Sequence, residues 1–356
     1  MQYSQLVEKA LAQYNEKLPF VLYSLPDSSE ITGIFQSNAD RTIAELSQEN
    51  GFVLAPFDSK KQKLQIPMKG SEILTCIDLP PVLETKKAVT ISERLADKEK
   101  HLTVTSKAIT KIKSGRAQKI VVSRKKEVRL KKFDLRKLCD SLFSQNPSAF
   151  RYIWFHPVTS LWCGATPEVL IKTNGSAFST MALAGTQKLQ GKSIIFWDKK
   201  ERNEQQWVVD AIVDTLLDKT TALNISKANT HIAGDLAHLR TDIKGVLNTS
   251  KHALQKIVET LHPTPAVCGT PRTKAQAFIL EHENYDREFY TGFLGITNSE
   301  VNKTELFVNL RCIKIEEDTA TLYAGGGITE DSNPEAEWEE THNKLQTMAK
   351  VLQPLL

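Results

Sequence analysis

Four glutamates form two pairs, and the members of each pair stand three residues apart. Glu201 and Glu204 open a charged helical pattern, whereas Glu337 and Glu340 follow a run of three glycines near the C-terminus. Residues three apart project from one face of a helix, so each pair presents two carboxylates in one direction. Two such helices could converge on one divalent cation, and ligands that are all oxygen favour Mg²⁺.

A metal-free explanation of these acids is also open. The spacing occurs by chance in many helices, where it marks a solvated face. In addition, Asp331-Ser332-Asn333-Pro334 is typical of a helix cap followed by an early proline. Carboxylates in a first helical turn are favoured by the helix dipole, so the second pair could simply belong to a helix start.

Two further ionisable residues adjoin apolar strands. Lys119 begins KIVVSR, where burial of its stem could lower the pKa of the amine enough for base chemistry. Glu168 lies in GATPEVLI between a proline and an apolar strand, where desolvation would keep its carboxyl protonated as a general acid. The alternatives are a lysine at a strand edge that faces solvent and an ordinary hairpin acid.

Two glycine-containing segments could bind a carboxylate. Backbone N–H groups with little side-chain obstruction are offered by AGT at residues 184–186 and by GGGI at residues 325–328. Plain turns between strands are the alternative for both segments. The segment AHLRTD contains His238. A histidine in such a segment more often makes its hydrogen bonds within a core or loop than takes part in catalysis.

The elements that must position these residues are groups of strands separated by a few helices. Apolar and β-branched runs bounded by turn residues predict strands over residues 19–25, 51–57, 119–130, 289–296, 305–318 and 319–328. Consecutive hairpin strands are predicted from residue 150 to 186, with turns at His156-Pro157 and Asn174-Gly175. Helical spacing predicts an opening helix and helices over residues 92–114, 199–217 and 273–283. Grouped strands favour an α+β fold with mainly antiparallel sheets.

Composition narrows the class of partner. A chain of 356 residues with 40% hydrophobic content can bury a full core, and its 46 basic and 42 acidic residues give an evenly spread net charge of +4. That balance argues against nucleic acid and against an anionic membrane. The five cysteines lie far apart without a CxxC pair, and no apolar run approaches ~18 residues. We therefore expect a cytoplasmic protein with a small-molecule substrate.

The candidate residues lie within ten ordered motifs, namely KIVVSR, GATPEVLI, ALAGT, KERNEQQWVVDAI, AHLRTDIKG, LHPTPAVCGTP, REFYTGFLG, NLRCI, AGGGIT and SNPEAEWEETHNK. Together they resemble the chorismate-utilising enzyme family, and the resemblance runs from about Lys111 to the C-terminus. It implies a large α+β unit with two mainly antiparallel sheets flanked by helices. Residues 91–356 would form the chorismate-binding catalytic region, and residues 1–90 an N-terminal part of the same unit without a usable family signature.

The resemblance implies a metal site at the two acidic pairs. Glu204 and Glu340 match the family's direct Mg²⁺ ligands. Glu201 and Glu337 match neighbouring acids that act through water or become ligands in some states. The cofactor implied is therefore Mg²⁺, held between the two sheets.

The resemblance also implies the acid, the base and the substrate contacts. Lys119 matches the lysine that activates water in isochorismate and salicylate synthases, and Glu168 matches their general acid. His238 matches a histidine near the pyruvyl ether of the substrate. Positions that contact substrate carboxylates in the family fall on Ala184, Gly185, Thr186, Tyr290, Arg311, Gly325, Gly327 and Lys344.

Three positions depart from the family's usual pattern. Gln205 stands where many members have His, Thr166 where Ser is usual, and Gly326 where Ala is usual. None of these departures removes a charged group that the implied chemistry needs.

Among the family's reactions, the motifs favour isochorismate synthase, an isomerase. Amine-forming relatives typically lack the lysine matched by Lys119, and aminodeoxychorismate synthases often have Lys where this chain has Ala184. Water is therefore the expected nucleophile, and we expect a monomer without a glutaminase subunit. A salicylate synthase, which goes on to eliminate pyruvate, is the main alternative. An anthranilate or aminodeoxychorismate synthase component and a catalytically silent chorismate-binding or docking protein are less favoured. Menaquinone and siderophore pathways both stay open.

Overall fold

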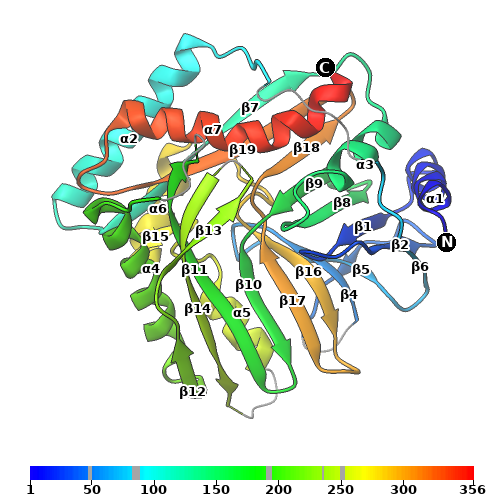
Figure 1. Ribbon diagram of the computed structural model, residues 1–356, viewed down its shortest axis with the longest axis horizontal. Coiled ribbons are helices and arrows are strands. Elements are labelled where there is room, and N and C mark those ends of the chain that lie inside the picture. Colours follow the sequence, from blue (N-terminus) through cyan, green and yellow to red (C-terminus); the bar gives the residue numbers. More distant parts are fainter. Residues whose placement is uncertain (47–49, 82–88, 190–194, 235, 249–252) are drawn as a thin grey trace.

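Two large β-sheets form the centre of the molecule (Figure 1). The computed structural model describes residues 1–46, 50–81, 89–189, 195–234, 236–248 and 253–356. Neighbouring strands run antiparallel in both sheets, from the hairpins to the pairings between strands distant in sequence. The predicted α+β class with mainly antiparallel sheets is confirmed.

The first sheet has nine strands in the described part of the chain. Their spatial order is β15 (Gly269–Thr270), β7 (Lys119–Arg129), β19 (Thr319–Ile328), β18 (Cys312–Glu316), β9 (Ser160–Thr166), β8 (Phe150–His156), β1 (Phe20–Ser24), β2 (Ile31–Gln36) and β6 (Ser71–Cys76).

The second sheet has ten strands among the described residues. Their order is β12 (Thr220–Ile225), β14 (Leu236–Leu247), β11 (Ala177–Lys188), β10 (Val169–Asn174), β17 (Lys303–Val308), β16 (Phe293–Asn298), β4 (Gly51–Ala55), β5 (Leu64–Pro67) and β3 (Thr42–Ile43), with β13 (Asn229–Ala233) also paired to β14. Strands from the first 80 residues thus extend both sheets at the same end.

Aromatic side chains fill the space between the sheets at that end. Phe150 of the first sheet stacks on Phe307 of the second, with ring centroids 4.1 Å apart. Phe52 packs against both Phe150 and Trp154 in the same cluster. Because these large rings are removed from water on both faces, this aromatic core holds the two sheets together.

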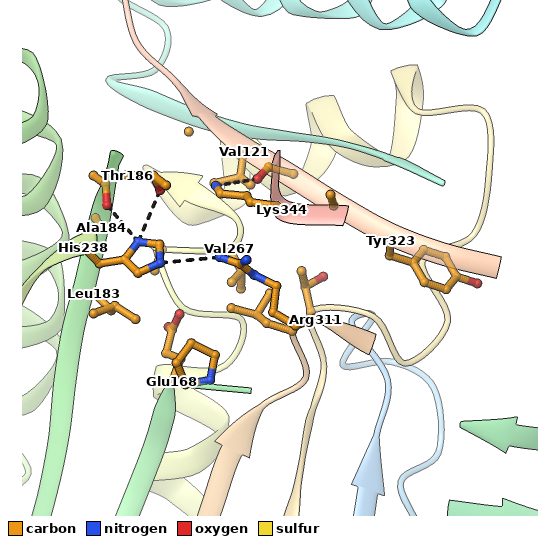
Figure 2. A pocket seen from close by; sticks show the side chains of 18 of the residues that line it. Val121, Glu168, Leu183, Ala184, Thr186, His238, Val267, Arg311, Tyr323 and Lys344 are labelled. Carbon is orange, nitrogen blue, oxygen red and sulfur yellow. Dashed lines mark hydrogen bonds between the residues drawn. The ribbon is translucent and has the colours of Figure 1, made fainter. Parts of the chain in front are cut away.

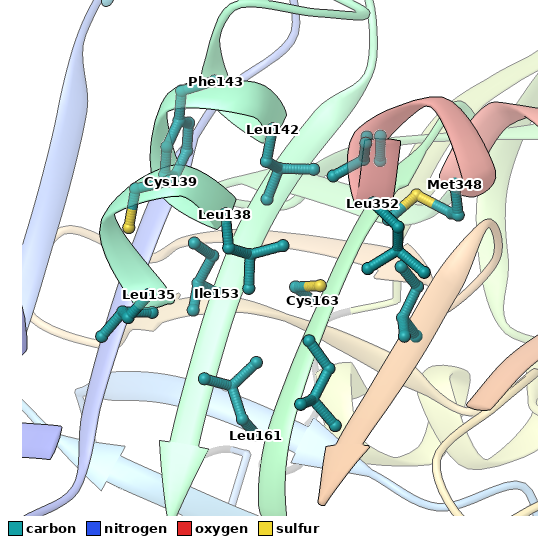
Figure 3. Packing of buried hydrophobic residues seen from close by; sticks show 14 of the residues in the cluster. Leu135, Leu138, Cys139, Leu142, Phe143, Ile153, Leu161, Cys163, Met348 and Leu352 are labelled. Carbon is teal, nitrogen blue, oxygen red and sulfur yellow. The ribbon is translucent and has the colours of Figure 1, made fainter. Parts of the chain in front are cut away.

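Helices cover the outer faces of both sheets. Leucines of α3 (Leu135–Phe143) and apolar residues of α7 (Pro334–Leu352) pack on β8 and β9 of the first sheet, as Figure 3 shows. The second sheet packs its outer face against α4 (Lys199–Leu216) and α5 (Ala253–Leu261). The remaining helices are α1 (Tyr3–Asn15), α2 (Leu95–Lys113), α6 (Arg272–His282) and a 3₁₀ turn at Gln353–Leu355. Among the described helices, none combines the length and hydropathy that crossing a bilayer requires.

Most predicted elements are confirmed. The helices predicted over residues 92–114, 199–217 and 273–283 correspond to α2, α4 and α6, and the turns at residues 156–157 and 174–175 close the hairpins β8–β9 and β10–β11. All five cysteines are free and buried.

Two strand predictions are wrong. The run 305–318 is not one strand, because β17 belongs to the second sheet and β18 to the first, with Arg311 at φ 47° between them. The run 289–296 becomes strand only at Phe293, after Thr291 at φ 60°. Both errors have one cause. The chain changes direction inside the molecule, where residues on either side of the turn are apolar and the sequence pattern shows no break.

Candidate active site

A pocket lies between the sheets at the end opposite the aromatic core, where β7 and β19 face β11 and β14. Figure 2 shows Glu168, His238, Arg311 and Lys344 arranged around it. Eleven of the fifteen candidate residues line the pocket, namely Glu168, Ala184, Gly185, Thr186, Glu204, His238, Tyr290, Arg311, Gly325, Gly327 and Lys344. The other four lie behind or beside this lining: Lys119 is next to Gly327, Glu201 next to Gly185, and Glu337 and Glu340 next to Gly326.

Two crossings of the chain between the sheets deliver polar residues to the pocket. The first crossing joins β9 to β10 and carries Glu168, and the second joins β17 to β18 and carries Arg311. A residue within a sheet pairs its backbone with neighbouring strands, whereas a residue at a crossing lies in the space between sheets. The two changes of sheet that the strand pattern does not reveal therefore build one wall of the pocket.

Glu168 is only 3% exposed. Its backbone N–H donates to Thr166 Oγ1 at 3.3 Å, its carbonyl accepts from Val308 N at 2.9 Å, and its side-chain Oε1 accepts from Thr264 Oγ1 at 3.4 Å. Burial raises the pKa of the Glu168 carboxyl to about 7, although the positive charge of Lys119 acts in the opposite direction. The predicted inward position of this acid is confirmed.

Lys119 is 1% exposed, so the alternative of a solvent-facing lysine is wrong. Its Nζ lies 2.9 Å from Glu204 Oε1. Gly327 of β19 lies against both groups: a Cβ at this position would approach Glu204 Oε1 to 2.2 Å and Lys119 Cε to 2.7 Å. Only glycine leaves room for this buried ion pair beside the pocket.

His238 and Arg311 contact each other across the pocket. His238 Nδ1 lies 3.0 Å from the carbonyl oxygen of Gly185, and because a carbonyl can only accept, Nδ1 carries the proton and donates. The other ring nitrogen, Nε2, then accepts from Arg311 Nη2 at 3.5 Å. Burial and the adjacent Arg311 guanidinium hold the pKa of His238 well below its usual range, so the imidazole is neutral.

Positive charge and hydroxyl groups face the same space. Burial lowers the pKa of Arg311 to about 10, which leaves the guanidinium charged at neutral pH. Lys344 Nζ donates to the carbonyl oxygen of Gly325 at 2.8 Å. The hydroxyl of Tyr290 would lie 3.1 Å from a Cβ atom added at Gly325. The ring of Tyr290 stacks on Tyr323. Two cations and a phenol at one pocket suit a substrate with more than one carboxylate.

Three of the four acids approach the glycine run of β19 from two helices, whereas Glu201 of α4 lies against Gly185 of β11. Glu204 lies against Gly327, as described above. From α7, Glu337 Oε2 lies 2.9 Å and Glu340 Oε1 lies 3.7 Å from the Cβ position of Gly326. The predicted start of α7 is confirmed, with Asn333 Oδ1 accepting from the backbone N–H of Ala336.

Three of these acids form ion pairs with lysines. The ion pairs are Lys119 with Glu204 at 2.9 Å, Lys200 with Glu337 at 2.9 Å and Lys344 with Glu340 at 2.6 Å. In keeping with these pairs, no group of three or more His, Cys, Asp or Glu side chains in the described ranges gathers to hold a metal ion.

The donor set nevertheless fits Mg²⁺. Glu201 Oε2 and Glu337 Oε2 are buried and have no hydrogen-bond partner among the described residues. Burial and the neighbouring Glu340 raise the pKa of Glu337, although the Lys200 ammonium acts in the opposite direction. Buried carboxylate oxygens without a hydrogen-bond partner are ligands that a hard divalent cation binds. The assignment of all four acids as ligands stays a prediction.

Comparison with known proteins identifies the family. A family model described as chorismate binding enzyme matches residues 57–353, which is most of the chain. The chain belongs to the chorismate-binding enzyme family.

Several members of the chorismate-binding enzyme family are similar to this chain. It is 34% identical over 223 residues to isochorismate synthase EntC of Escherichia coli (strain K12), covering 60% of this chain and 56% of that protein. It is 28% identical over 323 residues to isochorismate synthase MenF of Pasteurella multocida (strain Pm70), covering 86% and 74%. The crystal structure of DhbC from Bacillus anthracis superposes with a TM-score of 0.81 at 28% identity, covering 98% and 99%. The chain thus spans little more than half the length of the EntC protein that it matches.

The departures from the usual pattern of the chorismate-binding enzymes have structural explanations. Gln205 Nε2 donates to Thr241 Oγ1 at 2.8 Å and ties α4 to β14. Thr166 retains a hydroxyl, which donates to the carbonyl oxygen of Val308 at 2.6 Å and supports the backbone of Glu168. Gly326 gives the Glu337 carboxylate its close approach to β19.

Four residues that support the site were missed in the sequence. Thr264 contacts Glu168, Lys200 and Ser332 contact Glu337, and Thr347 accepts from Arg311 Nη1 at 3.2 Å. Thr264, Lys200 and Ser332 lie inside motifs of the chorismate-binding enzymes quoted above. Their roles arise from contacts across the fold, for which the sequence carries no local signal.

Proposed function

We propose that this chain is an isochorismate synthase, which converts chorismate to isochorismate with the help of Mg²⁺. The observation that carries the proposal is a buried lysine and a buried, protonatable glutamate at the same pocket. Lys119 lies behind the pocket lining beside Glu204 and Gly327, and Glu168 lines the pocket from the crossing between the sheets. Similarity to proteins named isochorismate synthases supports the same reaction.

Chorismate carries two carboxylates, and the pocket offers charges for both. Arg311 and Lys344 supply positive charge, and Tyr290 supplies a hydroxyl donor. The neutral His238 can contact the enolpyruvyl ether without adding charge. These contacts would hold the ring in one orientation, which is a prerequisite for attack at a single carbon.

The acidic pairs would hold the metal ion. Glu204 and Glu340, supported by Glu201 and Glu337, would bind Mg²⁺, which when bound supplies the counter-charge for the ring carboxylate. Glu204 would then be shared between this cation and Lys119.

Lys119 and Glu168 would move the protons. Lys119 would act as the base that takes a proton from the water that attacks C2 of the ring. Glu168, with a pKa of about 7, donates its proton to the C4 hydroxyl, which leaves as water while the ring double bonds shift. One hydroxyl is gained and one is lost, so the reaction is an isomerisation.

Water rather than ammonia is the proposed nucleophile. An amine-forming enzyme has no need of a base such as Lys119 for ammonia, and here the lysine is buried at the site. We therefore also propose that the chain acts without a glutaminase subunit.

The test is incubation of the purified chain with chorismate and MgCl₂, followed by chromatography of the products. Isochorismate alone supports the proposal. Salicylate with pyruvate would instead make the chain a salicylate synthase. Binding of chorismate without any turnover would overturn the enzyme proposal in favour of a silent binding protein.

A further inference from the structure

Lys200 is a charged neighbour of the proposed metal site to which the proposed reaction gives no role. It lies in the first turn of α4, and its side chain is 31% exposed. Its Nζ donates to Glu337 Oε1 on α7 at 2.9 Å, so it joins the two helices that carry the acids. The other two lysines that pair with these acids, Lys119 and Lys344, already have a role as base and as substrate contact.

The two oxygens of Glu337 differ in what they contact. Oε1 accepts from Lys200 and also from Ser332 Oγ at 2.7 Å. Oε2 has no hydrogen-bond partner among the described residues and lies against Gly326. The Glu337 side chain is 2% exposed, so solvent does little to screen its charge. One oxygen of this carboxylate is therefore neutralised by an ammonium group while the other is open to a cation.

We propose that Lys200 is the internal counter-ion of the metal-free site and competes with the divalent cation for Glu337. The proposal rests on the proposed Mg²⁺ site. A buried carboxylate without a counter-charge destabilises a fold, and Lys200 removes that penalty while no metal is bound. Once a cation reaches Glu337, the ammonium and the metal repel each other, so the same lysine weakens metal binding. Lys200 thereby stabilises the metal-free protein and, at the same time, lowers its affinity for the metal ion.

The experiment compares Lys200→Met with Lys199→Met. Lys199 precedes Lys200 in α4 and is exposed, so both variants remove one positive charge from the same turn. MgCl₂ is titrated calorimetrically into metal-stripped protein without substrate. Lys200→Met should bind Mg²⁺ about tenfold more tightly than wild type, because the competing charge is gone. Lys199→Met should match wild type.

Thermal unfolding gives a second readout that needs no activity. In EDTA, Lys200→Met should unfold about 5 °C below wild type, because Glu337 has lost its counter-ion. Saturating MgCl₂ should close that gap. If the methionine variant does not fold in EDTA, Lys200→Gln replaces it, because its amide can still donate to Glu337 without carrying charge.

Two variants separate charge from positioning. Lys200→Arg keeps the charge and should keep wild-type Mg²⁺ affinity, whereas Ser332→Ala removes only the neutral partner and should not tighten binding. Equal or weaker Mg²⁺ binding by Lys200→Met would overturn the counter-ion role. Absence of any Mg²⁺ binding by wild type would instead overturn the metal site of the proposed function, so the two failures are distinguishable.

Discussion

The same two sheets enclose two unlike interiors. At the end formed by β1, β8, β4 and β16, rings such as Phe52 and Phe150 pack in direct contact, with centroids 6.2 Å apart. At the end formed by β7, β19, β11 and β14, the sheets enclose a pocket that holds Glu168 and Arg311, with Lys119 behind it. One end buries apolar surface and the other buries ionisable groups.

The aromatic end therefore mainly stabilises the fold, whereas the pocket end holds the groups that could carry out chemistry. Apolar burial stabilises the fold by about 25 cal/mol for each Å² removed from water. Burial of ionisable groups costs free energy even when they are paired. The pocket end therefore lowers the free energy of unfolding, and apolar burial at the aromatic end offsets that loss. Substitutions at the two ends should therefore have opposite signatures in activity and in unfolding.

Removal of the metal should have the largest effect on the pocket end. We expect EDTA to abolish conversion of chorismate, because the ring carboxylate loses its counter-charge. Without the metal ion, the four glutamates repel one another and pair only with nearby lysines. Excess MgCl₂ should restore the rate. Full turnover in chelator, measured by product chromatography, would contradict the metal assignment and leave the acids as a purely structural cluster.

Loss of the proposed base should come next. Lys119→Ala should reduce conversion ~10²–10⁴-fold, the range typical of a positioned acid or base. Chorismate binding, measured by calorimetry, should persist, because Arg311 and Lys344 remain. The control is Lys113→Ala, which removes an exposed lysine at the end of α2. Loss of binding together with activity would reassign Lys119 to carboxylate recognition.

The sequence predicted the local parts of this fold and not the places where the chain changes sheet. The hairpins and α4 follow from periodicity and turn residues, because these features depend on neighbours in the chain. The crossings at Pro167 and Arg311 separate apolar strand runs, but no local feature shows that the chain changes sheet there. They depend on how two sheets pack, and that information is spread over strands far apart in the sequence.

The candidate site shows the same division. Spacing suggested the acidic pairs, and apolar flanking strands suggested Lys119 and Glu168. The family resemblance added substrate contacts such as Arg311, which the structure brings to the pocket. Contacts such as Lys200 with Glu337 and Thr264 with Glu168 join residues 137 and 96 positions apart. Neither contact follows from residue spacing in the sequence. Only the folded structure shows which neighbouring groups contact the predicted site residues.

Two adjacent glutamates of α7 test which helix face belongs to the pocket. Glu340 pairs with Lys344 at 2.6 Å, whereas Glu339 is exposed. Glu340→Gln should weaken Mg²⁺ binding by about 10–100-fold, and Glu339→Gln should leave it unchanged. The measurement is the MgCl₂ concentration that gives half-maximal turnover. Equal values in the two variants would place the metal on another face of α7.

The pH dependence should report Glu168. Burial raises the pKa of this carboxyl to about 7, so the protonated form that can donate to the leaving hydroxyl dominates below pH 7. As pH rises through about 7 the proton is lost, and kcat should fall by about tenfold per pH unit. A kcat that stays constant to pH 9 would show that another group donates the proton.

The smallest effect on activity should come from the aromatic end. Phe52 is fully buried and packs against Phe150 and Trp154, and none of these three residues lines the pocket. Phe52→Leu should lower the free energy of unfolding by about 1–3 kcal/mol, since it leaves space among rings that are close-packed. At a temperature where the variant is folded, kcat should stay within about twofold of wild type, because no group at the pocket has lost a contact. Urea unfolding followed by tryptophan fluorescence measures the first quantity, and product chromatography the second. A large fall in kcat without a fall in stability would mean that packing at the aromatic end sets the geometry of the pocket, and that the two interiors do not act independently.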